Sequence, residues 1–332
     1  MAYIDNYSLE GLMDPIIIWT GGSFSPPTIG HIAVAKIVAN FMYNIHKRPI
    51  VLYFIPVSYI YEKKSVKNDI FGRIGSDAAR LHMLNLCVQH LNENKNVIFR
   101  ISTMEMHKTQ NEKGVSTFQS IAMLKKLIND ENKENPVPDS SFYISFGQDN
   151  VEAILKGKWD GTFDLLSENL ICIPRPDDKH DAAETTNTLE YVKKSLMIAA
   201  RSKNGVSDML EHYKSNVPVP SGIHLNENAK ITSIKDILVT VYDIINRITI
   251  VTTSIPVEIS KASSTILRNE LAIYYQLSDE KQQAMQLDKL NQLSLPTIIQ
   301  YVLKENLYNP VLMRGGTKKE SKRRSKMGSK KG

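Results

Sequence analysis

The sequence feature that most constrains the fold is a short apolar run that ends at a glycine pair and leads into an apolar segment of helical length. The run is Ile16-Ile17-Ile18-Trp19, the pair is Gly21-Gly22, and the apolar segment spans residues 32–42. This order predicts a strand, a tight turn and a helix. Small residues at such a turn let backbone N–H groups approach a phosphate at the start of the helix. The chain therefore has a candidate anion site where the turn meets the helix.

Further apolar runs of strand length alternate with helical segments over the first 175 residues. Strands are predicted over residues 50–57, 96–104, 141–146 and 169–173, and a helix over residues 118–128. Such alternation predicts a parallel sheet with helices on both faces, which binds ligands at the carboxyl ends of its strands. The predicted fold class is α/β.

After residue 176 the pattern is less regular. Helices are predicted over residues 188–203, 233–246, 263–271 and 295–307, and a strand over residues 247–253. We expect a single domain over residues 1–312 with an insertion at about 180–250, followed by a disordered basic tail at 313–332.

The distribution of charge argues against nucleic-acid binding by the folded body. The net charge is +6, but residues 318–331 carry eight lysines and arginines against Glu320 alone, so the remainder is close to neutral. The tail itself is expected to bind nucleic acid only weakly and in a salt-sensitive way, and it also resembles a nuclear targeting signal.

Cysteine usage and hydropathy indicate an intracellular protein, either cytoplasmic or nuclear. Cys87 and Cys172 each lie in an apolar run, which predicts buried thiols and not a disulfide or metal framework. No apolar run is long enough to span a membrane, and residues 1–15 lack the layout of a signal peptide.

The glycine turn differs from the two most familiar phosphate loops. It lacks the Gly-Lys-Ser/Thr of a Walker A loop and the third glycine of the dinucleotide-binding fingerprint. Instead, Gly22-Ser23-Phe24 is followed by two prolines and then by Thr28 and His31. These two lie on one face of the predicted helix, where a hydroxyl and an imidazole would both face a phosphate. A capping or core histidine is the ordinary alternative.

The block from Gly21 to His31 resembles the phosphate-binding segment of the HxGH nucleotidylyltransferase superfamily. It is most similar to nicotinamide or nicotinate mononucleotide adenylyltransferases, in which Gly-x-Phe-x-Pro-x-(His or Thr)-x-x-His recurs. Thr28 stands at the first histidine position, as is typical of the eukaryotic-type enzymes. The resemblance implies a Rossmann-like fold and transfer of AMP from ATP to the mononucleotide, which forms NAD or deamido-NAD and releases pyrophosphate.

A second block, Ser263-Ser264-Thr265-Ile266-Leu267-Arg268, resembles the family's Ser-Ser-Thr-x-Ile-Arg motif. Hydroxyls and free N–H groups at the start of a helix attract anions, and an arginine on the next turn adds a charge-assisted hydrogen bond. A helix that is simply capped by serine is the alternative.

Shorter matches follow in the family's order. Residues 57–64 resemble a segment whose lysine, here Lys63, contacts phosphate, and Gly147-Gln148-Asp149 resembles a motif whose carboxylate binds the adenosine ribose. Trp159 matches a tryptophan that stacks on the nicotinoyl ring, and Arg175 matches an arginine after the next strand. Taken singly, each has an ordinary role as a helix cap, a core residue or a surface ion pair.

The Arg80-Leu81-His82-Met83 segment and the Asn306-Leu307-Tyr308 ending also resemble the family, without an implied role. The family's second stacking aromatic has no clear counterpart here, and Phe118 is the one candidate.

By this resemblance the site residues form three groups. The catalytic group is His31, Lys63 and Arg268. The group that binds ATP and phosphate is Gly22, Ser23, Phe24, Thr28, His31, Gly147, Asp149, Ser263, Ser264, Thr265 and Arg268. The group that binds the nicotinoyl nucleotide is Ser23, Phe24, Lys63, Trp159 and Arg175. Mg²⁺ is expected with ATP, and no metal ligands are expected among the protein's side chains.

Three alternatives stay open. The first is another nucleotidylyltransferase of the superfamily, such as a pantetheine-phosphate adenylyltransferase or a cytidylyltransferase. The second is a relative of class I aminoacyl-tRNA synthetases, and the third is a non-enzymatic nucleic-acid-binding or chaperone-like protein. The sequence does not decide between the amide and acid mononucleotides, or between a monomer and a homo-oligomer.

Overall fold

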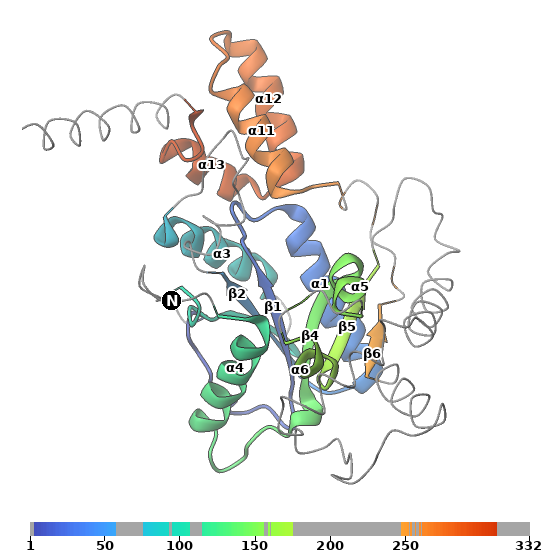
Figure 1. The fold of residues 1–332 in the computed structure, drawn as a ribbon. Helices are drawn as coiled ribbons and strands as arrows, with labels where there is room; N and C mark the ends of the chain where they lie inside the picture. Colours follow the sequence, from blue (N-terminus) through green and yellow to red (C-terminus); the bar gives the residue numbers. More distant parts are fainter. Residues whose placement is uncertain are drawn as a thin grey trace, which may run out of the picture.

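The computed structural model of the protein describes residues 3–57, 76–92, 95–106, 115–155, 159, 161–174, 247–251, 253, 256, 259 and 261–310. Its centre is a six-stranded sheet with the order β3-β2-β1-β4-β5-β6, in which every pair of neighbours is parallel (Figure 1). The strands are β1 (Ile16–Gly22), β2 (Ile50–Pro56), β3 (Val97–Ile101), β4 (Phe142–Gly147), β5 (Asn169–Ile173) and β6 (Ile248–Ile250). The predicted α/β class with a parallel sheet is confirmed.

Helices cover both faces of the sheet. They are α1 (Ile29–His46), α3 (Asp77–Leu91), α4 (Thr117–Glu131), α5 (Gln148–Leu155), α6 (Thr162–Leu166), α11 (Ser264–Tyr274), α12 (Glu280–Leu293) and α13 (Pro296–Lys304), with a 3₁₀ turn at Asp139–Ser141. Alternate residues of β1 enter different cores, as a strand buried on both faces requires. Ile16 and Ile18 pack with α1, α3 and the C-terminal helices, whereas Ile17 and Trp19 pack with α4, α5 and α6.

The order of the strands creates a switch point between β1 and β4. From β1 the chain moves outward to β2 and β3, and from β4 it moves to β5 and β6 on the other side. At such a point the loops after the two central strands diverge and leave a crevice at the carboxyl ends of the strands. The Oγ atoms of Thr20 in β1 and Ser145 in β4 are 2.6 Å apart near these ends. The candidate anion loop therefore begins at the place where this class of sheet binds ligands.

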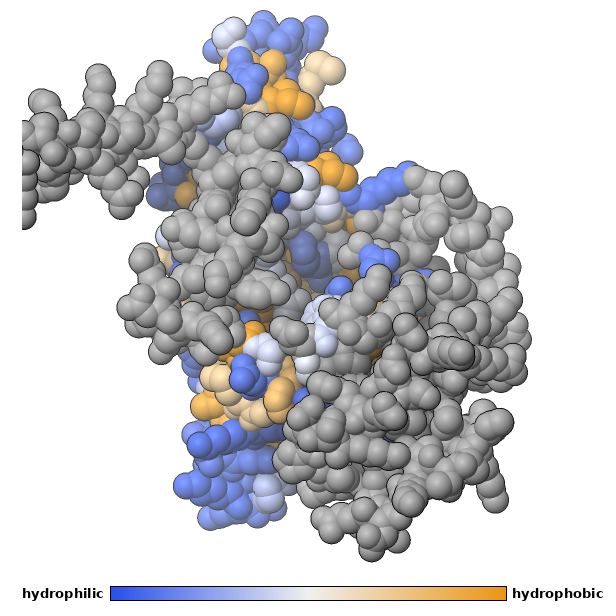
Figure 2. Space-filling model, viewed as in Figure 1, coloured by the Kyte–Doolittle hydropathy of each residue, from blue (hydrophilic) through white to orange (hydrophobic). Residues whose placement is uncertain are grey.

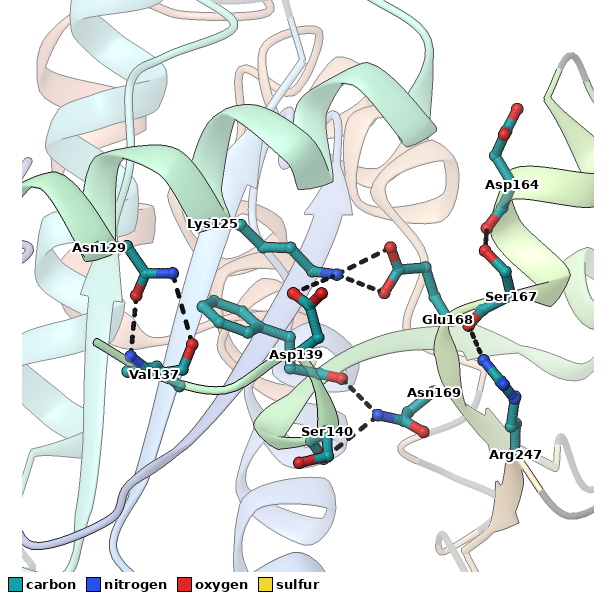
Figure 3. Close-up of polar contacts among 11 residues, drawn as sticks. Lys125, Asn129, Val137, Asp139, Ser140, Asp164, Ser167, Glu168, Asn169 and Arg247 are labelled. Carbon is teal, nitrogen blue, oxygen red and sulfur yellow. Dashed lines mark hydrogen bonds and ion pairs between the residues drawn. The ribbon is translucent and has the colours of Figure 1, made fainter. Parts of the chain in front are cut away.

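A polar cluster fastens α4 to the opposite, amino-terminal edge of the sheet (Figure 3). The Nζ of Lys125 lies 2.7 and 2.9 Å from the Glu168 carboxylate oxygens and 3.2 Å from Oδ1 of Asp139. The Asn129 amide bonds to the backbone N–H and carbonyl of Val137, and Asn169 donates to the carbonyl of Phe142. The amino-terminal edge therefore holds α4 against the sheet. The loops at the carboxyl ends of the strands make no part of this cluster and carry the candidate site.

Helices α11 and α12 form a hairpin that stands out beyond the carboxyl ends of the strands (Figure 1). Apolar side chains are exposed on this hairpin, among them Ile273 and Met285 (Figure 2). Among the described residues, no helix is both long and apolar enough to cross a bilayer.

The sequence predicted the placement of most elements but not all of their ends. The strand expected over residues 96–104 ends at Ile101, and the one expected over residues 247–253 is limited to Ile248–Ile250. Helices α5, α6 and α12 were not predicted. The helices expected over residues 188–203 and 233–246 lie outside the described residues, as do nearly all of the proposed insertion and the basic tail.

Candidate functional site

The loop that joins β1 to α1, residues 23–28, is held from outside by side chains that bind its backbone carbonyls. The donors come from α3, from α11 and from the C-cap residue that follows α12. Nη1 of Arg80 donates to the carbonyl of Ser23 at 3.0 Å, and Nη1 of Arg268 donates to that of Ser25 at 2.7 Å. Oγ of Ser264 donates to the carbonyl of Pro26 at 2.8 Å, and Oγ of Ser294 donates to that of Pro27 at 2.7 Å. The loop is therefore fixed by groups that are distant from it in the sequence.

The N–H groups of this loop have no comparable partners. Within the part of the chain that the structure describes, the backbone N–H groups of Ser23, Phe24 and Ser25 donate to no protein acceptor. Two further donors without intrahelical partners, those of Ile29 and Gly30, follow at the start of α1. Carbonyls bound to the scaffold and unpaired N–H groups together suit an anionic ligand.

Phe24 gives the loop its shape. Its backbone has φ of 47°, in the left-handed region that costs an ordinary residue about 1–2 kcal/mol. Its ring is buried and packs edge-on against Phe54 at 5.5 Å and His31 at 5.3 Å. Core packing of the ring offsets this backbone strain. Phe24 can therefore offer a ligand its backbone N–H but not its ring.

The glycine pair before the loop serves packing within the protein. A methyl group on Gly21 would lie 2.1 Å from the indole ring of Trp19, so this position must be glycine for the ring to fold back over it. The carbonyl of Gly22 accepts a hydrogen bond from the Val57 N–H at 3.0 Å. The expected close approach to a phosphate therefore belongs to the loop itself, and the need for glycine at residue 21 comes from Trp19.

Thr28 and His31 contact each other at the start of α1, but the Thr28 hydroxyl does not face outward with the imidazole as expected. Thr28 is the N-cap residue and is fully buried, and its hydroxyl donates to the carbonyl of Ala262 at 2.9 Å. The same hydroxyl is 2.7 Å from Nδ1 of His31. Thr28 therefore faces the protein and supports the imidazole, and only His31 is placed to contact a ligand.

Two groups of Thr28 orient the imidazole of His31. The backbone N–H of Thr28 points at Nδ1 at 3.1 Å, and the Thr28 hydroxyl lies 2.7 Å from the same nitrogen. Ser294 holds the carbonyl of Pro27, which belongs to the same peptide unit as the Thr28 N–H. The orientation of the ring is therefore fixed through Nδ1.

The second sequence block meets the first directly. Ser263 is the N-cap of α11 and accepts from the N–H of Ile266 at 3.2 Å, while the Thr265 hydroxyl lies 3.2 Å from Nη2 of Arg268. Gly30 lets the chain before α11 pack against α1, since a methyl group there would be 2.7 Å from the carbonyl oxygen of Ala262. The structure thus brings His31 and Arg268, which are far apart in the sequence, into one wall.

The β4 side of the switch point carries the remaining described candidates. Gly147 ends β4, and Asp149 is exposed in the first turn of α5. Trp159 is partly buried, and its ring packs edge-on against Phe146 at 5.3 Å. Phe118, at the start of α4, lies against Gly161, so the two aromatic candidates belong to neighbouring segments.

Two predicted site residues, Lys63 and Arg175, lie outside the described residues. Conversely, the structure adds four residues whose roles sequence reasoning missed. They are Gly30, Arg80, Ser294 and Tyr308, whose hydroxyl is 3.1 Å from Oγ of Ser25. Gly30, Arg80 and Tyr308 stood in blocks that resemble the family, but spacing along the chain could not show which loop they would contact.

The free cysteines are not candidates for covalent chemistry. Cys87 and Cys172 are both buried, as the sequence predicted. Burial raises the pKa of the Cys87 thiol to about 12, so it stays protonated at neutral pH. Among the described residues, no group of three or more His, Cys, Asp and Glu side chains could hold a metal ion.

A parallel sheet with a loop of unpaired N–H groups at its switch point places the protein in the Rossmann-like α/β class, in which ligands bind at the carboxyl ends of the strands. A family model described as cytidylyltransferase-like matches residues 19–269. This match covers most of the chain, so the protein belongs to the cytidylyltransferase-like family. The family supports a nucleotidyltransferase activity in general. Comparison with curated proteins gives no match.

Proposed function

We propose that the protein transfers AMP from ATP to nicotinamide mononucleotide, nicotinic acid mononucleotide or both. The observation that carries the proposal is the junction of the two sequence blocks. Ser264 and Arg268 of α11 donate to the carbonyls of Pro26 and Ser25 in the loop before α1. Two anion-attracting helix starts thereby meet beside the switch point.

The proposed reaction needs no protein nucleophile. A phosphate oxygen of the mononucleotide attacks the α-phosphorus of ATP, and the bond from that phosphorus to the β-bridging oxygen breaks. Pyrophosphate leaves with the electron pair of this bond. Positioning and stabilisation of the developing charge accelerate such a displacement.

The residues of the two sequence blocks, together with Lys63, have separate parts in this proposal. His31 contacts the reacting phosphates through its imidazole, and Arg268 and Lys63 supply positive charge. The N–H groups of Ser23 and Phe24 and the start of α11 at Ser263–Thr265 bind phosphate oxygens. Mg²⁺ enters as part of the MgATP substrate, bound to its phosphate oxygens.

The β4 side supplies the proposed contacts to the two nucleosides. Asp149 binds the adenosine ribose, and Trp159 stacks on the nicotinoyl ring with Arg175 nearby. Phe118 is the candidate for the second face of this ring, because it lies against Gly161, two residues after Trp159. Aromatic stacking of this kind favours a planar ring such as nicotinamide.

A second candidate is a different nucleotidylyl transfer, since the matching family model is described as cytidylyltransferase-like. A cytidylyltransferase would use CTP, and a pantetheine-phosphate adenylyltransferase would use ATP with a different acceptor. Both would use the same loop and the same α11 wall.

One assay distinguishes these candidates. The full chain is incubated with Mg²⁺ and either ATP or CTP, together with one acceptor at a time: nicotinamide mononucleotide, nicotinic acid mononucleotide, phosphopantetheine or phosphocholine. Pyrophosphate release and the mass of the product are measured. We expect dinucleotide only from ATP with a nicotinoyl mononucleotide. Product only from CTP, or only from a different acceptor, would overturn the proposal and retain a nucleotidyl transfer.

A further inference from the structure

We propose that Arg80 is a positioning residue for the anion site: by binding the Ser23 carbonyl it orients and polarises the N–H of Phe24 toward a bound phosphate. The inference rests on the proposed function in one respect, because it takes the loop at residues 23–28 to be the site of a phosphate. The sequence resemblance implied no role for Arg80.

The contacts of Arg80 point toward the loop and not toward solvent. Its side chain is fully buried near the start of α3. Nη1 donates to the carbonyl of Ser23 at 3.0 Å and Nη2 to Oδ1 of Asp77 at 2.5 Å. Nε is also buried and has no hydrogen-bond partner in the part of the chain that the structure describes. A ligand cannot touch a side chain in this position, so Arg80 must act through the loop.

The positive charge of Arg80 needs a reason beyond fastening the loop. The hydroxyls of Ser264 and Ser294 hold the neighbouring carbonyls of Pro26 and Pro27 without a charge. Burial of a guanidinium is costly unless the charge is compensated. Among the described residues, Asp77 compensates it only in part, because its own side chain is 38% exposed and therefore partly hydrated. A phosphate bound at the loop would add negative charge.

The peptide unit between Ser23 and Phe24 transmits this effect. Among the described residues the only cis peptide is Ser25–Pro26, so the 23–24 unit is trans and its C=O and N–H point in opposite directions. With the carbonyl bound to Arg80, the Phe24 N–H is turned away from α3. A cationic donor on the carbonyl also strengthens the N–H of the same unit as a donor. The buried Phe24 ring keeps this unit from rotating.

The test compares two arginines that make the same kinds of bond at opposite edges of the sheet. Arg48 donates to the backbone carbonyl of Asp14 at 2.7 Å and to its carboxylate at 2.6 Å, close to the amino-terminal ends of the strands. Arg80→Met and Arg48→Met are made in the full chain. Inorganic pyrophosphate and nicotinamide mononucleotide are titrated separately into each protein by calorimetry, and thermal unfolding is recorded.

We expect both variants to lose thermal stability, but only Arg80→Met to bind one or both anions about tenfold more weakly. The weaker binding would reflect the loss of a charge-assisted hydrogen bond, which is stronger than a neutral one. Arg80→Lys should bind between wild type and Arg80→Met. Arg80→Met that binds both anions as Arg48→Met does would overturn the inference. If Arg80→Met does not fold, wild-type anion affinity in Arg80→Lys would overturn it instead.

The same titrations separate this inference from the proposed reaction. A wild type that binds pyrophosphate but forms no dinucleotide contradicts the proposed function and leaves the role of Arg80 standing. Dinucleotide formation together with unchanged anion binding in Arg80→Met contradicts only the role of Arg80. A wild type that binds neither anion contradicts both.

Discussion

At the scale of single residues, the loop before α1 contains peptide units whose carbonyl oxygen is bound by a side chain from a distant helix, so that the N–H of the same unit has a fixed direction. Ser294 binds the carbonyl of Pro27, and the N–H of the same unit binds Nδ1 of His31. The hydroxyl of Thr28 lies 2.7 Å from the same Nδ1. Backbone and hydroxyl groups of the loop therefore orient the imidazole through Nδ1.

The first prediction concerns His31. His31→Ala removes the imidazole proposed to contact the reacting phosphates, and we expect turnover to fall by about 10²-fold or more with the fold intact. Steady-state rates of dinucleotide formation and thermal unfolding measure the two quantities. His90→Ala, at an exposed position on α3, is the control. Turnover close to wild type in His31→Ala would remove this residue from the mechanism.

The second prediction concerns Gly30, where the two blocks touch. Gly30→Ala places a methyl group 2.7 Å from the carbonyl oxygen of Ala262 and 3.0 Å from that of Ile259, so the chain before α11 must move away from α1. We expect a loss of about 1–3 kcal/mol in unfolding free energy, typical of overpacking, and reduced turnover. Urea unfolding and the dinucleotide assay test this. Asn44→Ala, exposed on the same helix, should change neither, and unaltered turnover in Gly30→Ala would show that the junction tolerates displacement.

At the scale of elements, the α11–α12 hairpin carries one wall of the site and is stabilised by charge. Glu270 of α11 accepts from Nε2 of Gln286 at 2.7 Å and lies 2.8 Å from Nζ of Lys289, both on α12. Burial acts to raise the pKa of Glu270, but the hydrogen bonds from Lys289 and Gln286 and the charge of Lys289 outweigh it, so the pKa is lowered. Arg268 extends from the same helix to the loop.

The third prediction follows from this lowered pKa. A carboxyl whose folded pKa lies below its ordinary value of 4.5 stabilises the fold above that pH and loses this contribution as the pH falls through the folded pKa. We expect Glu270→Gln to lower the unfolding free energy at pH 7 by less than about 1 kcal/mol, because Lys289 is half-exposed. Urea unfolding from pH 7 down to about pH 3 should show the difference vanish. Glu131→Gln, exposed on α4, is the charge-matched control, and a difference independent of pH would contradict the assignment.

Elements with strong local patterns were predictable, and those that depend on partners were not. The strand, turn and helix at residues 16–46 follow from an apolar run, glycines and an apolar helix. Helix α12 was missed because it is mostly polar and Leu290 is its only buried residue. Ser294 contacts Pro27 across a separation of 267 positions in the sequence, and Arg268 contacts Ser25 across 243 positions. No local pattern encodes such contacts. Resemblance placed both blocks at one site, but only packing shows how they touch.

At the scale of the whole molecule, the two edges of the sheet have separate tasks. The amino-terminal edge is fastened by the cluster of Lys125, Glu168 and Asp139 (Figure 3). The carboxyl edge carries the loop at residues 23–28, the start of α5 and the α11 wall. The match to the family model spans both sequence blocks and the residues of the amino-terminal edge. The basic segment at residues 318–331 lies beyond that match.

The last prediction separates an enzyme from a nucleic-acid-binding protein. Deletion of residues 314–332 removes nine lysines and arginines and one acidic residue, Glu320, so the net charge changes from +6 to −2. If the function is nucleotidyl transfer, kcat and KM for both substrates should stay within about twofold of the full chain, a change of less than about 0.5 kcal/mol. Any nucleic-acid binding by the full chain should weaken steeply with salt and disappear on deletion. Substrate kinetics and titration of a labelled duplex at two salt concentrations measure both effects. Loss of catalysis on deletion would place an essential part of the site within residues 314–332.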